Sequence, residues 1–404
     1  MKKLISLILV AVMLLSVMPM AYAEGNNYKT GDIIQFGSYP QSEVEDEILI
    51  NELNALAPEW DEWVSYEYYS GTGDYGTMVQ GDWMRYIDII HGGKKYRGVK
   101  FTEYRPECVW ELPPSLTYSI QNANGYNINA IYWFEFEALK WRVLDSISGL
   151  VMCETIIDSQ SFNNTIYRNG FGVYDCFNDF YYTNYACDYE KSSIRKWLNN
   201  NFYNTAFTDN EKKEITTTTI NNDGVLTSLG TSGYEKLDSK ETKDKIFLMS
   251  YNEVRNGKYG FSSDSYDYDG ARRAKSSDYA QSQGLYVYRD SNKINNGNSC
   301  WLLRSPGNYS LSSCIVDTLG TSHQSCDVGI TYGVRPALRF NDISKIVFDE
   351  SETPYIPEDN NGNEKNCSHI CHNVGLVAVI WKILRFFYKI FGINSICACG
   401  EAHY

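Results

Sequence analysis

The residues best suited to bind a metal lie in the last 40 positions of the chain. Cysteine and histidine occur there in two clusters, one on each side of an apolar segment. Thiolate and imidazole groups bind zinc in tetrahedral sites, and two such clusters flanking a helix suit one ion. Two disulfides are the alternative, which an exported protein permits. We predict a zinc site that takes four of six candidate ligands, which are Cys367, Cys371, His372, Cys397, Cys399 and His403.

The apolar segment between these clusters predicts a helix that lies on a membrane surface. Lys382, Arg385 and Lys389 recur at helical spacing and therefore share one stripe of the helix. At the centre of a bilayer each cation would cost roughly 2.5 to 3.5 kcal/mol. At the interface all three reach the headgroups, and Trp381 and Tyr388 suit that depth. The alternatives are a helix that docks on the rest of the protein and a tail that recruits a protein partner.

Residues 1–23 have the pattern of a secretory signal peptide. Lys2 and Lys3 form a basic start, an apolar run follows, and Ala21 and Ala23 form an Ala-x-Ala cleavage signal. An uncleaved membrane anchor is the alternative, but the apolar run is short for a span. We therefore predict an extracellular protein, associated with the membrane at the cell surface, and the style of the signal is typical of bacteria.

The charge of the chain is unevenly distributed. The 404 residues carry a net charge of −14, and removal of the two lysines of the leader takes this to −16. The last 40 residues alone carry +3, which leaves −19 on the remainder. Nucleic-acid binding requires a positive surface, so we predict no nucleic-acid partner. The distribution favours an arrangement with the tail on an anionic membrane and the remainder away from it.

Three parts follow the leader. A body covers residues 24–349, a linker covers 350–364, and the Cys/His tail covers 365–404. The linker consists mainly of Pro, Gly, Asn and acidic residues, which have little tendency to fold. Within the body, residues 42–130 form an aromatic-rich insertion that separates the first strand from the second.

The body combines strand and helix patterns and is predicted to be α+β. Residues 138–144 alternate between apolar and polar types, which predicts a strand whose Lys140 and Arg142 face water. A helix capped by Ser192 or Ser193 follows, because apolar residues after these serines recur at helical spacing. Thr208 begins a capping box for a second short helix.

The remaining strands are predicted from short apolar runs near both ends of the body. Pro336 lies inside the last of them and places that strand at an edge or a bulge. Residues 255–299 are rich in Ser, Asp, Tyr and Gly and are predicted to be a surface loop. The predicted strands cover residues 32–36, 150–153, 245–249, 301–304, 314–318 and 334–340.

Six segments of the body resemble a family of uncharacterised secreted proteins from gut Firmicutes, filed as a domain of unknown function. That family is more distantly similar to the C-type-lectin-like fold, which includes the formylglycine-generating enzymes and variable ligand-binding proteins. The resemblance implies a lectin-like body that spans about residues 31–340, with the insertion outside its core. The segments are Gly31–Gln41, Lys140–Asp145, Ser193–Asn199, Asp244–Ser250, Trp301–Gly307 and Gly333–Leu338.

Three residues of these segments are candidates for ligand binding. Arg304 and Arg335 can present a bidentate fork to an anionic ligand, and Trp301 precedes the first of them on the same strand. The alternative is that both arginines tie strands to loop carbonyls or a buried carboxylate, with Trp301 in the core. No catalytic residue is predicted. Cys314 and Cys326 lie where the resemblance implies redox cysteines, but a disulfide among Cys300, Cys314 and Cys326, or buried thiols, is favoured.

The sequence therefore favours a non-catalytic protein that displays aromatic loops to a glycan or protein ligand. Tyrosine and tryptophan offer an apolar face with a polar edge, which suits stacking on sugars. The acidic loop of Asp264, Asp267 and Asp269 is predicted to be a solvated face, with a calcium site as the alternative. The alternatives for the whole protein are an extracellular enzyme of the same fold and a scaffold whose tail recruits a partner.

Overall fold

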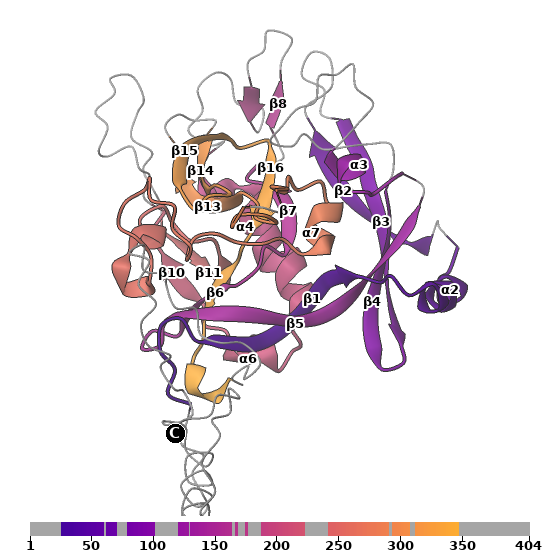
Figure 1. Ribbon diagram of the computed structural model, residues 1–404, viewed down its shortest axis with the longest axis horizontal. Coiled ribbons are helices and arrows are strands. Elements are labelled where there is room, and N and C mark those ends of the chain that lie inside the picture. Colours follow the sequence, from indigo (N-terminus) through magenta and orange to yellow (C-terminus); the bar gives the residue numbers. More distant parts are fainter. Residues whose placement is uncertain are drawn as a thin grey trace, which may run out of the picture. The chain divides into compact units, whose positions relative to one another are not determined.

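A computed structural model describes the body of the protein (Figure 1). The leader, the linker and the Cys/His tail lie outside the described residues, and so do the predictions made for them. The chain divides into two compact units, Met1–Pro357 and Glu358–Tyr404, and every described residue belongs to the first. The described residues are 26–59, 62–70, 79–101, 120–128, 130–163, 166–168, 174–176, 187–222, 241–290, 293–307 and 312–346.

The larger sheet has eight strands in the order β12-β17-β6-β5-β4-β3-β2, with β1 paired to β5. Strand β5 is 15 residues long, and its successive parts pair with β4, β1 and β6. The strand thus joins both ends of the body into one sheet. Its members are β1 (Ile33–Glu43), β2 (Val64–Ser70), β3 (Val79–His91), β4 (Lys94–Phe101), β5 (Ile131–Asp145), β6 (Leu150–Cys153), β12 (Ile246–Phe247) and β17 (Ala337–Arg339).

The first strand is longer than predicted, because Gly37 does not end it. Strand β1 continues to Glu43 through a bulge between Gln35 and Ser38. Gly37 has a φ of 71°, and a Cβ there would lie 2.5 Å from the Phe207 ring. Glycine therefore lets the strand bend past an aromatic side chain instead of terminating it.

The insertion at 42–130 continues the larger sheet. Strands β2, β3 and β4 form an antiparallel meander that joins the sheet where β4 pairs with the start of β5. Helix α2 (Glu47–Leu56) adds Leu53 to a small separate cluster with Tyr96 and Trp133. The insertion therefore extends the sheet of the body and carries a small core of its own.

A second sheet has five strands in the order β15-β14-β13-β16-β7. The chain passes directly from one sheet to the other, with no element in between, from β6 to β7 and from β16 to β17. Pro336 lies at the second crossing, where its carbonyl accepts a hydrogen bond from the amide of Cys153 at 2.8 Å. The single strand predicted at 334–340 is therefore two strands. The members are β7 (Asp158–Ser161), β13 (Trp301–Pro306), β14 (Ser312–Val316), β15 (Ser322–Asp327) and β16 (Thr331–Val334).

Short helices and ribbons complete the body. The side chain of Ser192 accepts a hydrogen bond from the amide of Arg195 and caps the predicted helix, and Thr208 and Glu211 form the predicted capping box. The helices are α3 (Ile120–Ala123), α4 (Ser193–Trp197), α5 (Tyr203–Ala206), α6 (Glu211–Glu214) and α7 (Asp278–Ser282), and the ribbons pair β8 (Ile166–Arg168) with β9 (Tyr174–Cys176) and β10 (Thr218–Ile220) with β11 (Thr242–Asp244).

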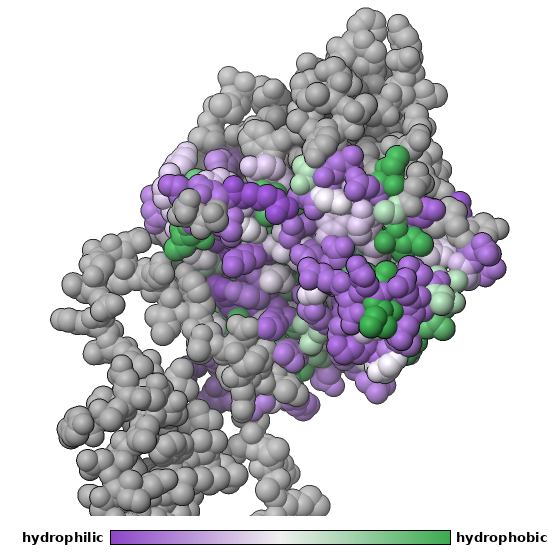
Figure 2. Space-filling model, turned by 45° about the vertical axis from the view of Figure 1, so that its right-hand side comes forward, coloured by the Kyte–Doolittle hydropathy of each residue, from purple (hydrophilic) through white to green (hydrophobic). Residues whose placement is uncertain are grey.

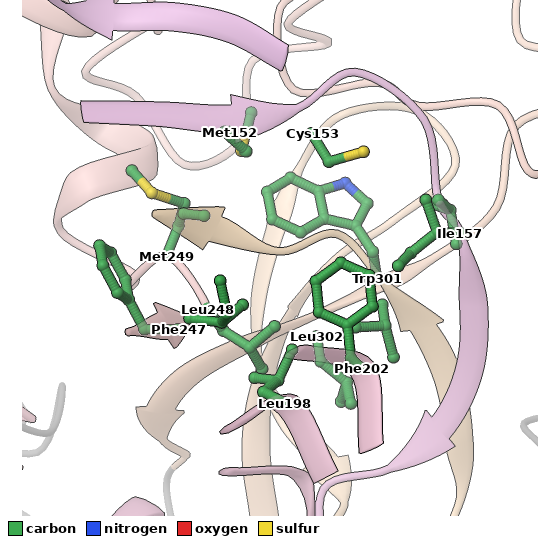
Figure 3. Close-up of a cluster of buried hydrophobic side chains, with 14 of the residues drawn as sticks. Met152, Cys153, Ile157, Leu198, Phe202, Phe247, Leu248, Met249, Trp301 and Leu302 are labelled. Atoms are coloured by element: carbon green, nitrogen blue, oxygen red, sulfur yellow. The ribbon is translucent and has the colours of Figure 1, made fainter. Parts of the chain in front are cut away.

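One large core holds together the two sheets and the helical residues 193–206, which begin with α4. Figure 3 shows Trp301 packed among Cys153, Ile157 and Phe202. Cys153 ends β6, Ile157 lies between β6 and β7, and Phe202 lies in the helical residues that follow α4. This burial corrects two predictions. Arg142 is buried rather than exposed to water, because the face of β5 that carries it is also covered. Residues 255–299 are not a simple surface loop, since they contribute buried side chains within α7 and on both sides of it, among them Ala271, Arg272, Tyr279 and Leu285.

Candidate functional site

Trp301 and Arg335, two of the predicted ligand-binding residues, lie together inside the body. Both side chains are completely buried, and the guanidinium carbon of Arg335 lies 5.1 Å from the centre of the Trp301 ring. The indole nitrogen of Trp301 donates to the carbonyl of Arg272 at 3.0 Å, and Nη1 of Arg335 donates to the same carbonyl at 3.3 Å. Both side chains therefore converge on the backbone of Arg272.

Arg335 is also bound on its other side. Its Nε donates to the carbonyl of Cys153 at 2.7 Å, and its Nη2 lies 3.6 Å from Oε2 of Glu154. Glu154 in turn accepts two hydrogen bonds from Arg142. Burial lowers the pKa of Arg335 to about 10, which leaves it protonated at neutral pH. The contacts of Arg335 are those of a residue that ties strands to carbonyls and a carboxylate.

Arg304 lies in a separate environment. It forms a bidentate pair with Glu253 at 2.5 and 2.8 Å, and it donates to the carbonyls of Leu248 and Asn221 at 2.6 and 3.2 Å. Only 2% of the residue is exposed. The three predicted ligand-binding residues therefore do not form one open site in this structure, and all three face the interior.

Exposed aromatic side chains are found on a neighbouring segment, the tyrosine loop, defined here as residues 262–270. Tyr266 is 81% exposed and Tyr268 is 71% exposed, although large aromatic side chains are usually half or more buried. They alternate with Asp267 and follow Asp264, so apolar ring faces and carboxylates are presented together. This combination of groups is the one expected of a surface that stacks on a ring and accepts hydrogen bonds from it.

The carboxylates of the tyrosine loop hold its backbone turns. Asp264 accepts from the amide of Tyr266 at 2.9 Å, and Asp269 accepts from the amides of Ser262 and Ala271, each at 2.8 Å. Asp267 accepts from the hydroxyl of Ser262. No group of three or more His, Cys, Asp or Glu side chains suited to a metal ion occurs among the described residues. The calcium alternative for this loop therefore finds no support.

A second segment, the histidine turn, is defined here as residues 317–323. Oδ2 of Asp317 accepts a hydrogen bond from the hydroxyl of Thr321 at 2.6 Å and lies 2.9 Å from Nε2 of His323. That same nitrogen lies 2.7 Å from the hydroxyl of Thr321. The hydrogen bond to Asp317 raises the pKa of His323 above its usual value of 6.5. The turn thus presents a half-exposed imidazole that its pairing with Asp317 keeps protonated to a higher pH than usual.

The tyrosine loop and the histidine turn pack against each other. The amide of Ser322 donates to the carbonyl of Ser265 at 2.9 Å. Gly320 has a φ of 87°, and a Cβ at this position would lie 2.2 Å from the carbonyl oxygen of Asp269. Only glycine permits both this backbone conformation and this close approach. The two segments are therefore held together through their backbones.

The cysteines of the second sheet do not form a reactive pair. Cys300 and Cys314 carry free thiols, so no disulfide joins either of them to Cys326. Burial raises the pKa of Cys314 far above its usual value and that of Cys300 to about 12. Both thiols are therefore protonated at neutral pH and are poor nucleophiles. The structure therefore supports thiols rather than a disulfide at these positions, with Cys314 buried and Cys300 and Cys326 partly buried.

Residues 174–341 match the family model described as a domain of unknown function, DUF6273. The match confirms the resemblance to a domain-of-unknown-function family for this part of the chain, and it includes the tyrosine loop, the histidine turn and Arg272. The motifs at 31–41 and 140–145 lie outside the matched residues. No curated protein and no solved structure matches the chain. Within the described part of the body, no helix is long and apolar enough to cross a membrane.

The residues that the sequence predicts for ligand binding, Trp301, Arg304 and Arg335, are all buried. The sequence predicts an acidic loop at Asp264, Asp267 and Asp269, but composition alone does not single out its two exposed tyrosines. Thr321 directly precedes β15 and His323 lies within it. Because they are two residues apart in extended backbone, their side chains lie on the same face of the strand. That spacing is the signal that identifies the histidine turn.

Proposed function

We propose that this is an exported cell-surface protein whose body binds a neutral glycan through the tyrosine loop and the histidine turn. The proposal includes a C-type-lectin-like body and a tail that holds it at the outer face of the membrane. The observation that carries it is the pair of exposed tyrosines, Tyr266 and Tyr268, on a loop fastened at both ends. A fastened loop loses little conformational entropy when its rings stack on a ligand.

A neutral glycan fits the chemistry of this surface better than an anionic ligand. Sugar hydroxyls donate hydrogen bonds to carboxylates such as Asp264 and Asp267, whereas sulfate or uronate groups would be repelled by them. Among the described residues, the face shown in Figure 2 is mainly hydrophilic, and its hydrophobic areas are small and separate. On the tyrosine loop itself, two exposed rings beside carboxylates favour a ligand bound by stacking and hydrogen bonds over a protein partner with a broad apolar interface.

The test is a glycan array probed with the full-length mature protein. Tyr266→Ala combined with Tyr268→Ala should lower the affinity for bound neutral glycans by at least about tenfold, because each ring contributes on the order of 1 kcal/mol of stacking. Ile90→Ala in β3 is the matched control, since Ile90 is 76% exposed and lies on a different element. Binding that survives in the double tyrosine variant, or an array with no bound neutral glycan, would contradict the proposal.

A further inference from the structure

We infer that Arg272 is a positioning residue that holds the tyrosine loop in its ligand-presenting conformation, and that Trp301 and Arg335 support the loop through the backbone of Arg272. This inference rests on the proposed function of the tyrosine loop. It gives the two sequence-predicted ligand residues a role that agrees with their complete burial.

Arg272 holds the tyrosine loop from inside. Its Nη2 donates to the carbonyls of Asp264 and Asp267 at 2.7 and 3.1 Å, and its Nε lies 3.3 Å from Oδ2 of Asp269. These three contacts lie before, between and after the two exposed tyrosines. The carbonyls of the loop therefore turn inward to the guanidinium while the rings of Tyr266 and Tyr268 turn outward.

The backbone of Arg272 is fixed from the other side. Its carbonyl accepts hydrogen bonds from the indole of Trp301 and from Nη1 of Arg335, and Arg335 is fixed in turn by the carbonyl of Cys153. A continuous series of hydrogen bonds thus runs from Cys153 at the end of β6, through Arg335 and Arg272, to the tyrosine loop. A shift of Trp301 or Arg335 can therefore reach the tyrosines by moving Arg272.

The geometry of the side chain makes Arg272 difficult to replace. One planar guanidinium contacts two carbonyls and one carboxylate at once, whereas the ammonium of lysine is a point charge on a flexible stem. Arg272 is completely buried, and neither its Nε nor its Nη1 makes a hydrogen bond with the protein, so its Nη2 makes all of its side-chain hydrogen bonds. A fully desolvated charge persists in such a place only when its other contacts are strong, which identifies the loop carbonyls as its principal partners.

Hydrogen exchange of the full-length mature protein tests the positioning role without any ligand. In Arg272→Gln, the amides of Ser262, Tyr266 and Ala271 should exchange at least about tenfold faster than in the wild type, because the loop opens locally. Arg272→Lys should restore part of the protection. Trp301→Phe keeps the ring but removes the donor to the Arg272 carbonyl, so it should give a smaller increase at the same amides.

Arg304→Gln is the matched control, since Arg304 is also a buried arginine bound to two carbonyls and a carboxylate. Arg304→Gln should lower global stability. The amides of the tyrosine loop and those of β13 should then exchange faster by the same factor, so that the ratio of their exchange rates stays as in the wild type. Unchanged loop protection in Arg272→Gln and Trp301→Phe, or an increase spread evenly over the body, would overturn the inference. Should Arg272→Gln not fold, the Trp301→Phe comparison decides.

A second measurement separates the inference from the proposed function. Glycan affinity is compared in a double-mutant cycle between Arg272→Lys and the combined tyrosine variant. A positioning role predicts that Arg272→Lys lowers affinity in the wild type and has no further effect without the tyrosines. Faster loop exchange with no glycan bound by any variant rejects the proposed function alone. Equal losses in both backgrounds reject the positioning of the rings by Arg272.

Discussion

At the scale of single residues, buried polar groups determine how this protein responds to its surroundings. Asp158 in β7 is 2% exposed and accepts hydrogen bonds from the Tyr39 hydroxyl at 2.7 Å, from Gln160 at 3.0 Å and from the Ser159 amide at 2.7 Å. Burial raises the pKa of Asp158 to about 6, although the nearby charge of Arg97 opposes the shift. The Asp158 carboxyl therefore binds a proton in the buried contact between β1 and β7.

The raised pKa of Asp158 makes folding stability depend on pH. A carboxyl whose pKa is higher in the folded state than in the unfolded state contributes its stabilisation at low pH and loses it as the pH rises through 6. Through this group alone, the free energy of unfolding should fall by about 2 to 3 kcal/mol between pH 4 and pH 8. Asp158→Asn should lack that decrease in denaturant titrations across this range.

Asp145 in the β5–β6 turn is the matched control for Asp158. The hydrogen bond from Ser148 lowers the pKa of Asp145, so the contribution of this carboxylate to stability is lost as the pH falls. Asp145→Asn should therefore change the profile in the opposite sense. His323 changes stability only above its ordinary pKa of 6.5, at the upper end of the titration. An unaltered wild-type slope in Asp158→Asn would show that the buried carboxyl does not carry it.

At the scale of elements, the candidate site depends on how closely the tyrosine loop and the histidine turn approach. Gly320→Ala should destabilise the protein by about 1 to 3 kcal/mol and weaken glycan binding, because the added Cβ would meet the Asp269 carbonyl and part the two segments. Thermal unfolding and the glycan array measure the two effects.

Gly93→Ala separates the close contact from the backbone conformation alone. Gly93 lies in the β3–β4 turn with a φ of 81°, and nothing lies within 4 Å of its Cβ position. This substitution should cost only the strain of the left-handed conformation and leave glycan binding intact. Equal destabilisation by the two alanines would mean that the approach of Gly320 to Asp269 is not required.

At the scale of the whole molecule, the charge of the chain predicts how the protein is oriented. The body with its linker carries −19 and the tail +3, so only the tail is attracted to an anionic bilayer. Changing Lys382, Arg385 and Lys389 together to Gln should abolish sedimentation of the full-length mature protein with anionic vesicles. The same changes should leave any residual binding to neutral vesicles intact. Co-sedimentation with anionic vesicles that is unaffected by the charge changes argues against the surface helix.

Metal analysis tests the proposed zinc site of the tail. One zinc ion per chain is expected in the purified mature protein, and none after Cys367 and Cys397 are both changed to Ser. Four oxidised tail cysteines without zinc support the disulfide alternative instead.

The local patterns of the sequence were sufficient for several elements. Residues 150–153 form a strand, Ser192 caps the helix after it, and Thr208 and Glu211 form a capping box, because each of these signals acts over a few residues. The same reasoning could not place Arg142. A charged residue in an alternating strand is expected to face water, and only the packing of both faces of β5 shows that it is buried beside Glu154.

The tertiary structure alone decided where the candidate site lies. The sequence determined that the body is α+β, acidic and rich in aromatic residues, since these properties belong to local composition. Which aromatic residues are exposed depends on contacts between segments far apart in the chain. Arg272 precedes α7, Trp301 lies in β13 and Arg335 follows β16, and these three residues meet only through long-range hydrogen bonds to the Arg272 carbonyl. The same fold leaves Tyr266 and Tyr268 at the surface.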